Sequence, residues 1–163
     1  MHSGISKNGK SESAEGRMRE IEAKEVYKLK NCLQELADHH NNVSVNFKGC
    51  YPKQPFEETL IHFSSDLDSR KSSIAVIEEE DRVVGFCKIN YVSTIGVIEY
   101  LVVSKKYRGK GYGAQLMEWA LKRFEDLGIH DIDVKVADGN DAISLYEKYG
   151  FRMNAHILRL DRK

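Results

Sequence analysis

Apolar residues recur at two different spacings along this chain, and the spacing separates helices from strands. Spacings of three and four residues predict helices at residues 25–39 and 111–127, and Gly128 ends the second of them. Short apolar runs predict strands at residues 83–91 and 96–103. The run GVIEYLVV in the second strand is almost continuously apolar, so we expect this strand to be covered on both faces.

Weaker patterns complete a mixed order of elements. A charged turn at residues 80–82 predicts a hairpin, which joins the preceding strand to the strand at residues 83–91. Further strands are expected at residues 18–23, 73–77, 132–136 and 151–160, and further helices at residues 56–63 and 141–149. This order is typical of an α/β fold in which helices pack on a mixed central sheet.

The length of 163 residues suits one domain, which we assign to residues 17–163. Residues 1–16 are rich in Ser, Gly and Lys, so we expect them to be a disordered tail or an artificial extension. Lys plus Arg equals Asp plus Glu, with 25 of each. A neutral chain has no general attraction for nucleic acid or an anionic membrane, so any anion must be bound by a local site.

Cysteine and hydropathy patterns favour a cytoplasmic protein. Cys32, Cys50 and Cys87 are odd in number and match no metal-binding spacing, so we interpret them as free thiols of a reducing compartment. No N-terminal apolar run resembles a signal peptide, and no apolar run reaches the length of about 18 residues that a membrane span requires. We therefore expect neither a membrane partner nor a metal ion.

A glycine-rich turn connects the apolar strand to the long helix. It consists of Arg108, Gly109, Lys110, Gly111, Tyr112 and Gly113. Backbone N–H groups at a helix start lack intrahelical partners and together carry about half a positive charge. Glycines let the backbone approach a phosphate closely, and Lys105 and Lys106 add positive charge nearby. The turn is therefore suited to a pyrophosphate.

Other interpretations of this turn compete. A P-loop requires Ser or Thr after Gly-Lys, but Gly111 follows Lys110, so that motif is excluded. Gly109-x-Gly111-x-x-Ala114 fits a relaxed dinucleotide fingerprint, although too little chain follows to build two nucleotide-binding halves. The turn alone also fits a tight strand-to-helix connection with solvated lysines.

The turn resembles the acetyl-CoA-binding signature of the GNAT superfamily of N-acetyltransferases, which reads Arg/Gln-x-x-Gly-x-Gly/Ala. Here it is Arg108-x-x-Gly111-x-Gly113. Residues 142–151, AISLYEKYGF, resemble the second signature of that family, and both lie in the family order. The resemblance implies a single-domain fold with a mixed, mostly antiparallel central sheet, a splayed strand pair and about four flanking helices.

The resemblance also implies a pose for acetyl-CoA, the expected cosubstrate. Backbone amides of the turn would hold the pyrophosphate. The main chain of Leu101, Val102 and Val103 would pair with the pantetheine arm, which fills the gap between the splayed strands.

One position departs from the family pattern. The family often places an asparagine seven residues before the tyrosine that Tyr146 matches. Here that position is Gly139, and Asn140 follows it. Asn140 is therefore the candidate for a side-chain contact with a pantetheine amide.

Direct attack of an amine on the acetyl thioester needs a deprotonated amine, a polarised carbonyl and a stabilised thiolate. The resemblance places the Tyr146 hydroxyl near the cofactor sulfur. Since a phenol with pKa about 10 is a weaker acid than a thiol with pKa about 8.5, complete proton transfer is uphill by about 2 kcal/mol. We therefore expect Tyr146 to stabilise the thiolate by a hydrogen bond. A packed core tyrosine is the alternative.

Glu99 is the candidate base. It is the lone carboxylate in an apolar run, and its expected burial would make it a better proton acceptor. Many family members carry a glutamate on this strand. A purely structural carboxylate is the alternative. A backbone N–H at or near Val103 would polarise the carbonyl oxygen.

We therefore expect an N-acetyltransferase that acts through a ternary complex. Its acceptor would be a small primary amine, or the N-terminus or a lysine of a protein, in a pocket built mainly from residues 39–70. Two alternatives remain open, a non-catalytic acyl-CoA sensor on the same fold and a nucleotide-binding module that uses the same turn. No nucleic-acid partner is expected, and a homodimer is left open.

Overall fold

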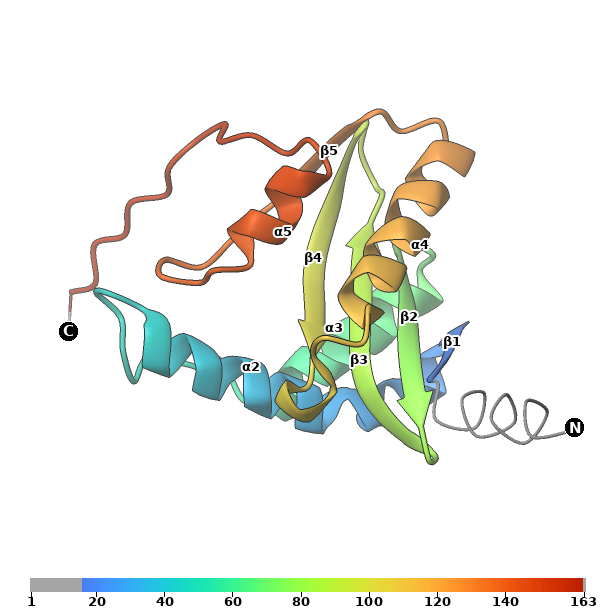
Figure 1. Cartoon of the computed structure of the whole chain (residues 1–163), viewed down its shortest axis with the longest axis horizontal. Coiled ribbons are helices and arrows are strands. Elements are labelled where there is room, and N and C mark those ends of the chain that lie inside the picture. Colours follow the sequence, from blue (N-terminus) through green and yellow to red (C-terminus); the bar gives the residue numbers. More distant parts are fainter. Residues whose placement is uncertain (1–15, 163) are drawn as a thin grey trace, which may run out of the picture.

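A five-stranded sheet with helices on both faces forms the fold in the computed structural model, which describes residues 16–162 (Figure 1). Its strands follow chain order across the sheet. They are β1 (Arg17–Glu20), β2 (Ser72–Glu79), β3 (Arg82–Asn90), β4 (Ile95–Val103) and β5 (Asp131–Val134). The first three pairings are antiparallel, whereas β4 and β5 run parallel. The predicted mixed, mostly antiparallel sheet is therefore confirmed.

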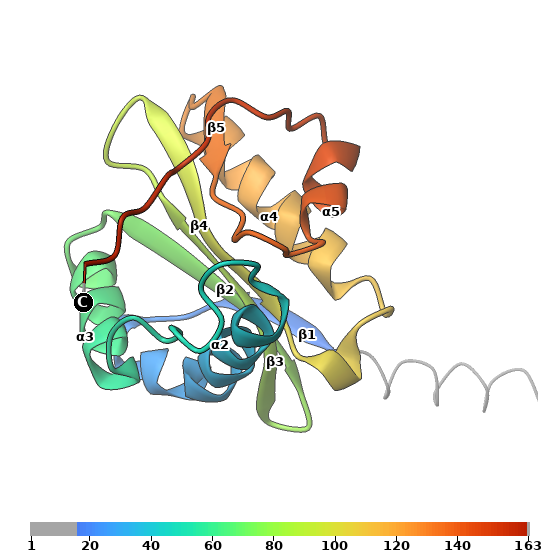
Figure 2. The ribbon, with the colours of Figure 1, turned by 90° about the vertical axis from the view of Figure 1, so that its left-hand side faces the viewer.

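Helices cover both faces of the sheet (Figure 2). One layer contains η1 (Ala23–Leu29), α2 (Lys30–Val43) and α3 (Phe56–Asp68). The other contains α4 (Tyr112–Asp126) and α5 (Ile143–Lys148), and the short η2 (Lys105–Tyr107) leads from β4 to α4. Each face has its own core, with Phe63 and Val102 under the α2/α3 layer and Ile98 and Phe124 under the α4 layer. The four α-helices of the described chain agree with the predicted number.

Strand β4 contains a β-bulge at Glu99. Ile98 pairs with Ile89 of β3, but Tyr100 pairs with Lys88, so Glu99 is the extra residue. A bulge re-aims side chains along a strand. Ile98 packs in the core on the α4 side, whereas Tyr100 packs on the α2/α3 side and Glu99 also bonds to groups there.

The pairing of β4 with β5 stops where the bulge begins. Residues 95–98 pair with residues 131–134, and β4 then continues to Val103 without a neighbouring strand on that edge among the described residues. The chain after β5 turns away from β4 toward α5 (Figure 1). The predicted splayed pair is therefore present, and the gap opens beyond Ile98.

The predicted final strand at residues 151–160 is wrong. The structure assigns no strand to this segment, which extends away from the sheet (Figure 1) and leaves Leu158 94% exposed. Its apolar residues suggested a strand, but a strand also needs a neighbour that shares its hydrogen bonds, and β5 pairs with β4 alone. The predicted helix at residues 25–39 is divided into η1 and α2.

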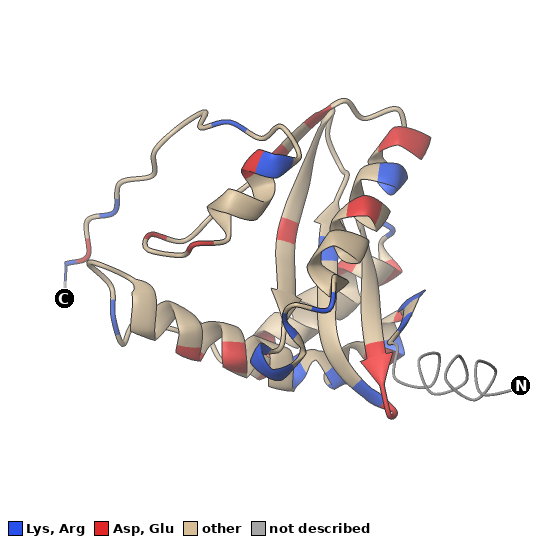
Figure 3. Cartoon of the chain, viewed as in Figure 1, with Lys and Arg blue, Asp and Glu red and all other residues tan. Residues whose placement is uncertain are grey.

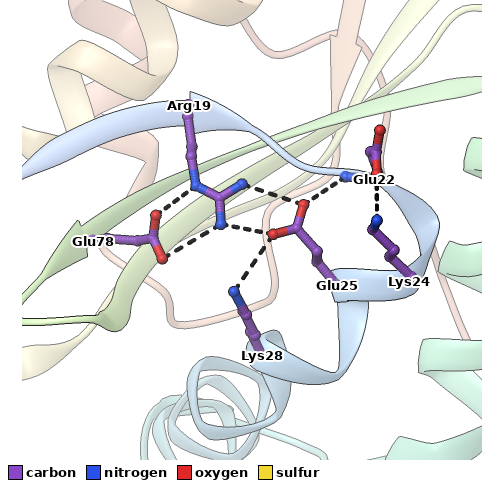
Figure 4. A network of polar contacts seen from close by, with 6 residues as sticks. All are labelled: Arg19, Glu22, Lys24, Glu25, Lys28 and Glu78. Carbon is purple, nitrogen blue, oxygen red and sulfur yellow. Dashed lines mark hydrogen bonds and ion pairs between the residues drawn. The ribbon is translucent and has the colours of Figure 1, made fainter.

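A network around Arg19 ties β1 to the rest of the fold (Figure 4). The Arg19 guanidinium donates to Glu25 of η1 at 2.7 Å and to Glu78 of β2 at 2.6 Å. The hydrogen bond from Arg19 is the largest cause that lowers the pKa of Glu25 to about 2. The first strand and the first helical turn are therefore held at one edge of the sheet.

The predicted tail at residues 1–16 lies outside the described residues, except for Gly16. The Gly16 N–H donates to the Tyr112 hydroxyl at 2.8 Å, so this residue contacts the domain. No helix between residues 16 and 162 is long and apolar enough to cross a membrane. The cytoplasmic location stays a prediction.

Candidate functional site

The turn between η2 and α4 presents a row of free backbone N–H groups. No described residue accepts a hydrogen bond from the N–H groups of residues 109–114. Gly111 is the N-cap of α4 and supplies no capping side chain. Adjacent donors at a helix start form a binding site for phosphate oxygen atoms. The structure thus has the unpaired donors that a pyrophosphate requires.

Gly109 and Gly111 shape this turn through their backbone conformation. Their φ angles are +83° and +84°, in the left-handed region that favours glycine. An added Cβ would meet no atom within 4 Å at either position, so conformation and not crowding requires glycine here. Lys and Arg residues gather on the segment that leads into α4 (Figure 3). Arg108 Nε donates to the Val103 carbonyl at 3.1 Å and fixes the turn to the end of β4.

Lys110 and Tyr112 direct their side chains toward β2. Lys110 Nζ lies 3.1 Å from Glu79 Oε2, and the Tyr112 hydroxyl donates to the same carboxylate oxygen. The charge of Lys110 is therefore balanced within the protein, and Tyr112 offers the anion its backbone alone. Any affinity of the turn for an anion would therefore come from the N–H row and the remaining basic residues of the segment.

Strand β4 leaves two residues open toward the gap beside β5. The Ser104 N–H donates to β3 at 2.8 Å, so by alternation Val102 also directs its main chain to β3. Leu101 and Val103 direct theirs to the opposite edge, where pairing with β5 has ended. Leu101, Val102 and Val103 were predicted to contact pantetheine. Of these three, Leu101 and Val103 direct their main-chain N–H and C=O groups toward the gap.

Tyr146 of α5 combines a packed ring with an unpaired hydroxyl. The residue is 6% exposed, and its ring packs edge-on against Phe151 at 5.7 Å between centroids. Its hydroxyl has no hydrogen-bond partner among the described residues. It is not fully buried, because Arg123 Nε is the one fully buried side-chain polar atom of residues 16–162 that lacks a hydrogen bond. Burial first, and Cys87 second, raise the pKa of the Tyr146 hydroxyl.

Glu99 lies in an ion-pair cluster on the α2/α3 side. Lys88 Nζ lies 2.9 Å from Glu99 Oε2 and 2.9 Å from Asp66 Oδ2 of α3. It also donates to Asn90 Oδ1 at 2.8 Å, and the Asn90 amide donates to Glu99. The Lys88 side chain is fully buried, whereas that of Glu99 is 34% exposed. The predicted burial of Glu99 is therefore wrong, because the bulge turns it to a partly open face. Its role as a base stays a prediction.

The sequence interpretation missed Lys88 and Asp66. Lys88 is a lone charge within an apolar strand, and that pattern is itself a signal, because a buried ammonium without partners costs several kcal/mol. The partner on α3 could not be identified from sequence spacing, since it depends on how α3 crosses the sheet. No group of three or more His, Cys, Asp or Glu side chains in residues 16–162 could hold a metal ion.

The loop from β5 to α5 touches the C-terminal end of α2. Asn140 Oδ1 accepts from the Ala142 N–H at 2.9 Å, and Asn140 Nδ2 lies 3.4 Å from His40 Nε2. The Asn140 side chain therefore supports the start of α5 and contacts α2. Its predicted contact with pantetheine stays a prediction.

Gly139 occupies the position where the family often has asparagine. Its φ is +79°, and an added Cβ would lie 2.0 Å from the Val43 carbonyl oxygen. The contact between this loop and α2 therefore excludes any side chain at residue 139.

Gly139→Ala is expected to destabilise the fold by about 2–4 kcal/mol, since it combines an unfavourable φ with a clash against backbone. Thermal denaturation should show a loss in Tm of about 5–10 °C. Gly128→Ala is the matched control, because Gly128 also has a positive φ (+72°) but an added Cβ meets nothing within 4 Å. Equal losses in the two variants would contradict the contact with Val43.

A pocket of about 270 Å³ opens on the same face as Glu99. It lies between α2, the loop from α2 to α3, α3 itself and Tyr100 of β4. Most of its lining residues fall within residues 39–70, the segment in which an acceptor pocket was predicted. The pocket and the glycine-rich turn at residues 108–113 therefore lie on different elements around β4.

A helix start with unpaired donors beside a split parallel strand pair is the architecture of an acetyltransferase fold. The chain matches the model of the acetyltransferase (GNAT) family over residues 31–151, and it belongs to that family. The predicted family and fold are confirmed.

Solved structures of acetyltransferases share this fold. A predicted acetyltransferase of Clostridium acetobutylicum with acetyl-CoA has a TM-score of 0.72 and 17% identity, covering 90% of this chain and 96% of that one. The PaiA N-acetyltransferase of Thermoplasma acidophilum with coenzyme A has a TM-score of 0.65 and 16% identity, covering 85% and 91%. An aminoglycoside N-acetyltransferase with CoA has a TM-score of 0.68 and 13% identity, covering 91% and 95%. No curated protein sequence matches this chain.

Proposed function

We propose that this chain transfers the acetyl group of acetyl-CoA to a primary amine by direct attack within a ternary complex. The observation that carries the proposal is the row of free N–H groups at residues 109–114, next to the open edge of β4. The N–H row would bind the pyrophosphate, and Leu101 and Val103 would pair with the pantetheine arm. The thioester would then lie where β4 and β5 separate, close to Glu99.

Three groups carry out separate parts of the reaction at the thioester. A main-chain N–H on the open edge of β4, between Glu99 and Val103, polarises the carbonyl oxygen of the thioester. Glu99 takes the proton that the amine loses, directly or through water. As the C–N bond forms and the C–S bond breaks, the Tyr146 hydroxyl donates a hydrogen bond to the departing thiolate. Since burial raises the pKa of Tyr146, this bond stabilises the thiolate without complete proton transfer, and the thiolate takes its proton from solvent.

Calorimetry and a turnover screen test this proposal together. CoA, NAD and ATP are titrated into the protein, and CoA is expected to bind most tightly. Release of free thiol from acetyl-CoA is then measured with polyamines, aminoglycosides, amino acids and N-terminal peptides. Binding of CoA without thiol release from any amine would favour the acyl-CoA sensor, and tighter binding of ATP or NAD would favour the nucleotide module.

Glu99→Gln is expected to lower kcat/KM about 100-fold at neutral pH, because general bases contribute about 10²–10⁴-fold. In the unaltered protein kcat/KM should fall as pH decreases, because protonation of the base removes its capacity to accept a proton. The variant should lose this acidic limb. The measurement is a pH–rate profile of kcat/KM.

Asp66→Asn is the matched control, since it removes the other carboxylate bonded to Lys88 and leaves Glu99 in place. It should keep the acidic limb. An acidic limb that does not move in Glu99→Gln excludes Glu99 as the base. Equal changes in both variants would assign the effect to the charge of the cluster.

A further inference from the structure

The pocket beside Tyr100 has apolar walls and a single charged side chain. Aliphatic side chains of α2 and the Phe56 ring of α3 form much of its lining. Its lining residues include no Asp or Glu, and Lys53 is the one Lys or Arg among them. His40 also lines the pocket, and burial, followed by the nearby His39, lowers its pKa. The His40 imidazole is therefore neutral near pH 7.

The neighbouring cluster around Lys88 has the opposite character. It contains the carboxylates of Asp66 and Glu99 and the one ammonium of Lys88, which leaves a net negative charge. Phe63 lies between the cluster and the pocket, with its ring 5.0 Å from Lys88 Nζ and 5.1 Å from the Tyr100 ring. The bulge also brings Glu99 and Tyr100 to the same face. An apolar chamber and an anionic group are thus side by side.

We infer that the acceptor is a primary amine with one positive charge on an apolar group the size of an aromatic ring, as in phenylethylamine. The inference rests on the proposed function. The cluster attracts the single ammonium before it loses its proton to Glu99, and the pocket accepts the ring. An apolar cavity of about 150 Å³ holds benzene, so about 270 Å³ has room for a ring and a short chain.

The same surfaces oppose a polycation. A polyamine or aminoglycoside would place its additional ammonium groups against apolar walls and toward Lys53, where no lining carboxylate can pair with them. The fold alone does not determine whether a polycation is accepted, since a structure with the same fold is an aminoglycoside N-acetyltransferase. The side chains of the pocket therefore determine the acceptor class.

The experiment compares thiol release from acetyl-CoA with phenylethylamine, ethylamine, spermidine and kanamycin as acceptors. The kcat/KM of phenylethylamine should exceed that of ethylamine about 30-fold or more, because the comparison isolates burial of one ring. It should also exceed those of both polycations. A rate with ethylamine equal to that with phenylethylamine, or a preference for spermidine or kanamycin, would overturn the inference.

A charge reversal locates the acceptor in this pocket. Lys53→Glu changes an exposed side chain, and it should raise kcat/KM for spermidine about fivefold relative to kcat/KM for ethylamine. Lys48→Glu is the matched control, because Lys48 is an exposed lysine of the same loop that does not line the pocket. It should change neither value more than about twofold. An unchanged spermidine value in Lys53→Glu would overturn the assignment of the acceptor to this pocket.

Failure of the inference and failure of the proposed function give different results. Thiol release with any amine but without a preference for the ring overturns the inference and leaves the proposed function in place. Absence of thiol release with every amine overturns the proposed function. The pocket is then tested by titrating phenylethylamine and ethylamine into CoA-saturated protein, where preferential binding of phenylethylamine supports the inference and its absence overturns it.

Discussion

Tyr146→Phe is expected to lower kcat for acetyl transfer about 100-fold and to leave the Kd of acetyl-CoA within about twofold. The hydroxyl has no partner among the described residues, so it is available to a group that binds beside α5. The charge on sulfur develops in the transition state, and loss of its hydrogen bond therefore affects kcat rather than binding. Thiol release measures kcat, and calorimetry measures the Kd.

Tyr149→Phe is the matched control for this variant. Tyr149 follows α5 and packs against the same core, but no catalytic role is proposed for it. Its kcat should stay within about twofold. Tyr146→Phe removes no internal hydrogen bond of the described chain, so the free energy of unfolding should change by less than about 1 kcal/mol. An unchanged kcat would remove Tyr146 from the mechanism and leave it as a core residue.

The conformation of the glycine-rich turn at residues 108–113 could be predicted from the sequence because it depends on local backbone. A helix start follows from the apolar spacing after Gly111, and a helix start always has unpaired N–H groups. Glycine at residues 109 and 111 permits the left-handed φ angles that the structure shows. Both features depend on neighbours along the chain, so no knowledge of the packing was needed.

The environment of Glu99 could not be predicted in this way. The apolar run predicted a strand that is covered on both faces, but the bulge at Glu99 turns this side chain to a partly open face. The pairing shift is a property of β3 and β4 together, and Lys88 and Asp66 reach Glu99 from separate elements. The sequence therefore identified the carboxylate but not the ion pair that holds it.

Two other features of the structure could not be predicted from the sequence for a similar reason. The apolar residues that suggested a strand at residues 151–160 belong to one chain segment, whereas a strand exists only with a partner. Gly139 was recognised as a departure from the family, but its cause, the Val43 carbonyl, lies on α2 and is visible only in the fold. In both cases, contacts between segments that are distant in the sequence account for the difference between the prediction and the structure.

Gly113→Pro is expected to raise the Kd of CoA about 10- to 100-fold. The variant removes one N–H from the row at residues 109–114, and a hydrogen bond to a charged group contributes about 1.5–3 kcal/mol. Gly113 is the second residue of α4, in the first helical turn, where the helix does not need the backbone N–H that proline lacks. Calorimetry measures the Kd, and circular dichroism should show unchanged helix content.

Gly113→Ala separates the lost donor from added bulk. It keeps the N–H, and its Cβ would lie 3.7 Å from Leu145 Cδ2, which is an ordinary contact. Its Kd for CoA should stay within about threefold of the unaltered value. Both substitutions add atoms to the same residue, so crowding of a phosphate would weaken binding in both, whereas loss of the donor affects proline alone. Equal Kd values for the two variants would contradict pyrophosphate binding by the Gly113 N–H.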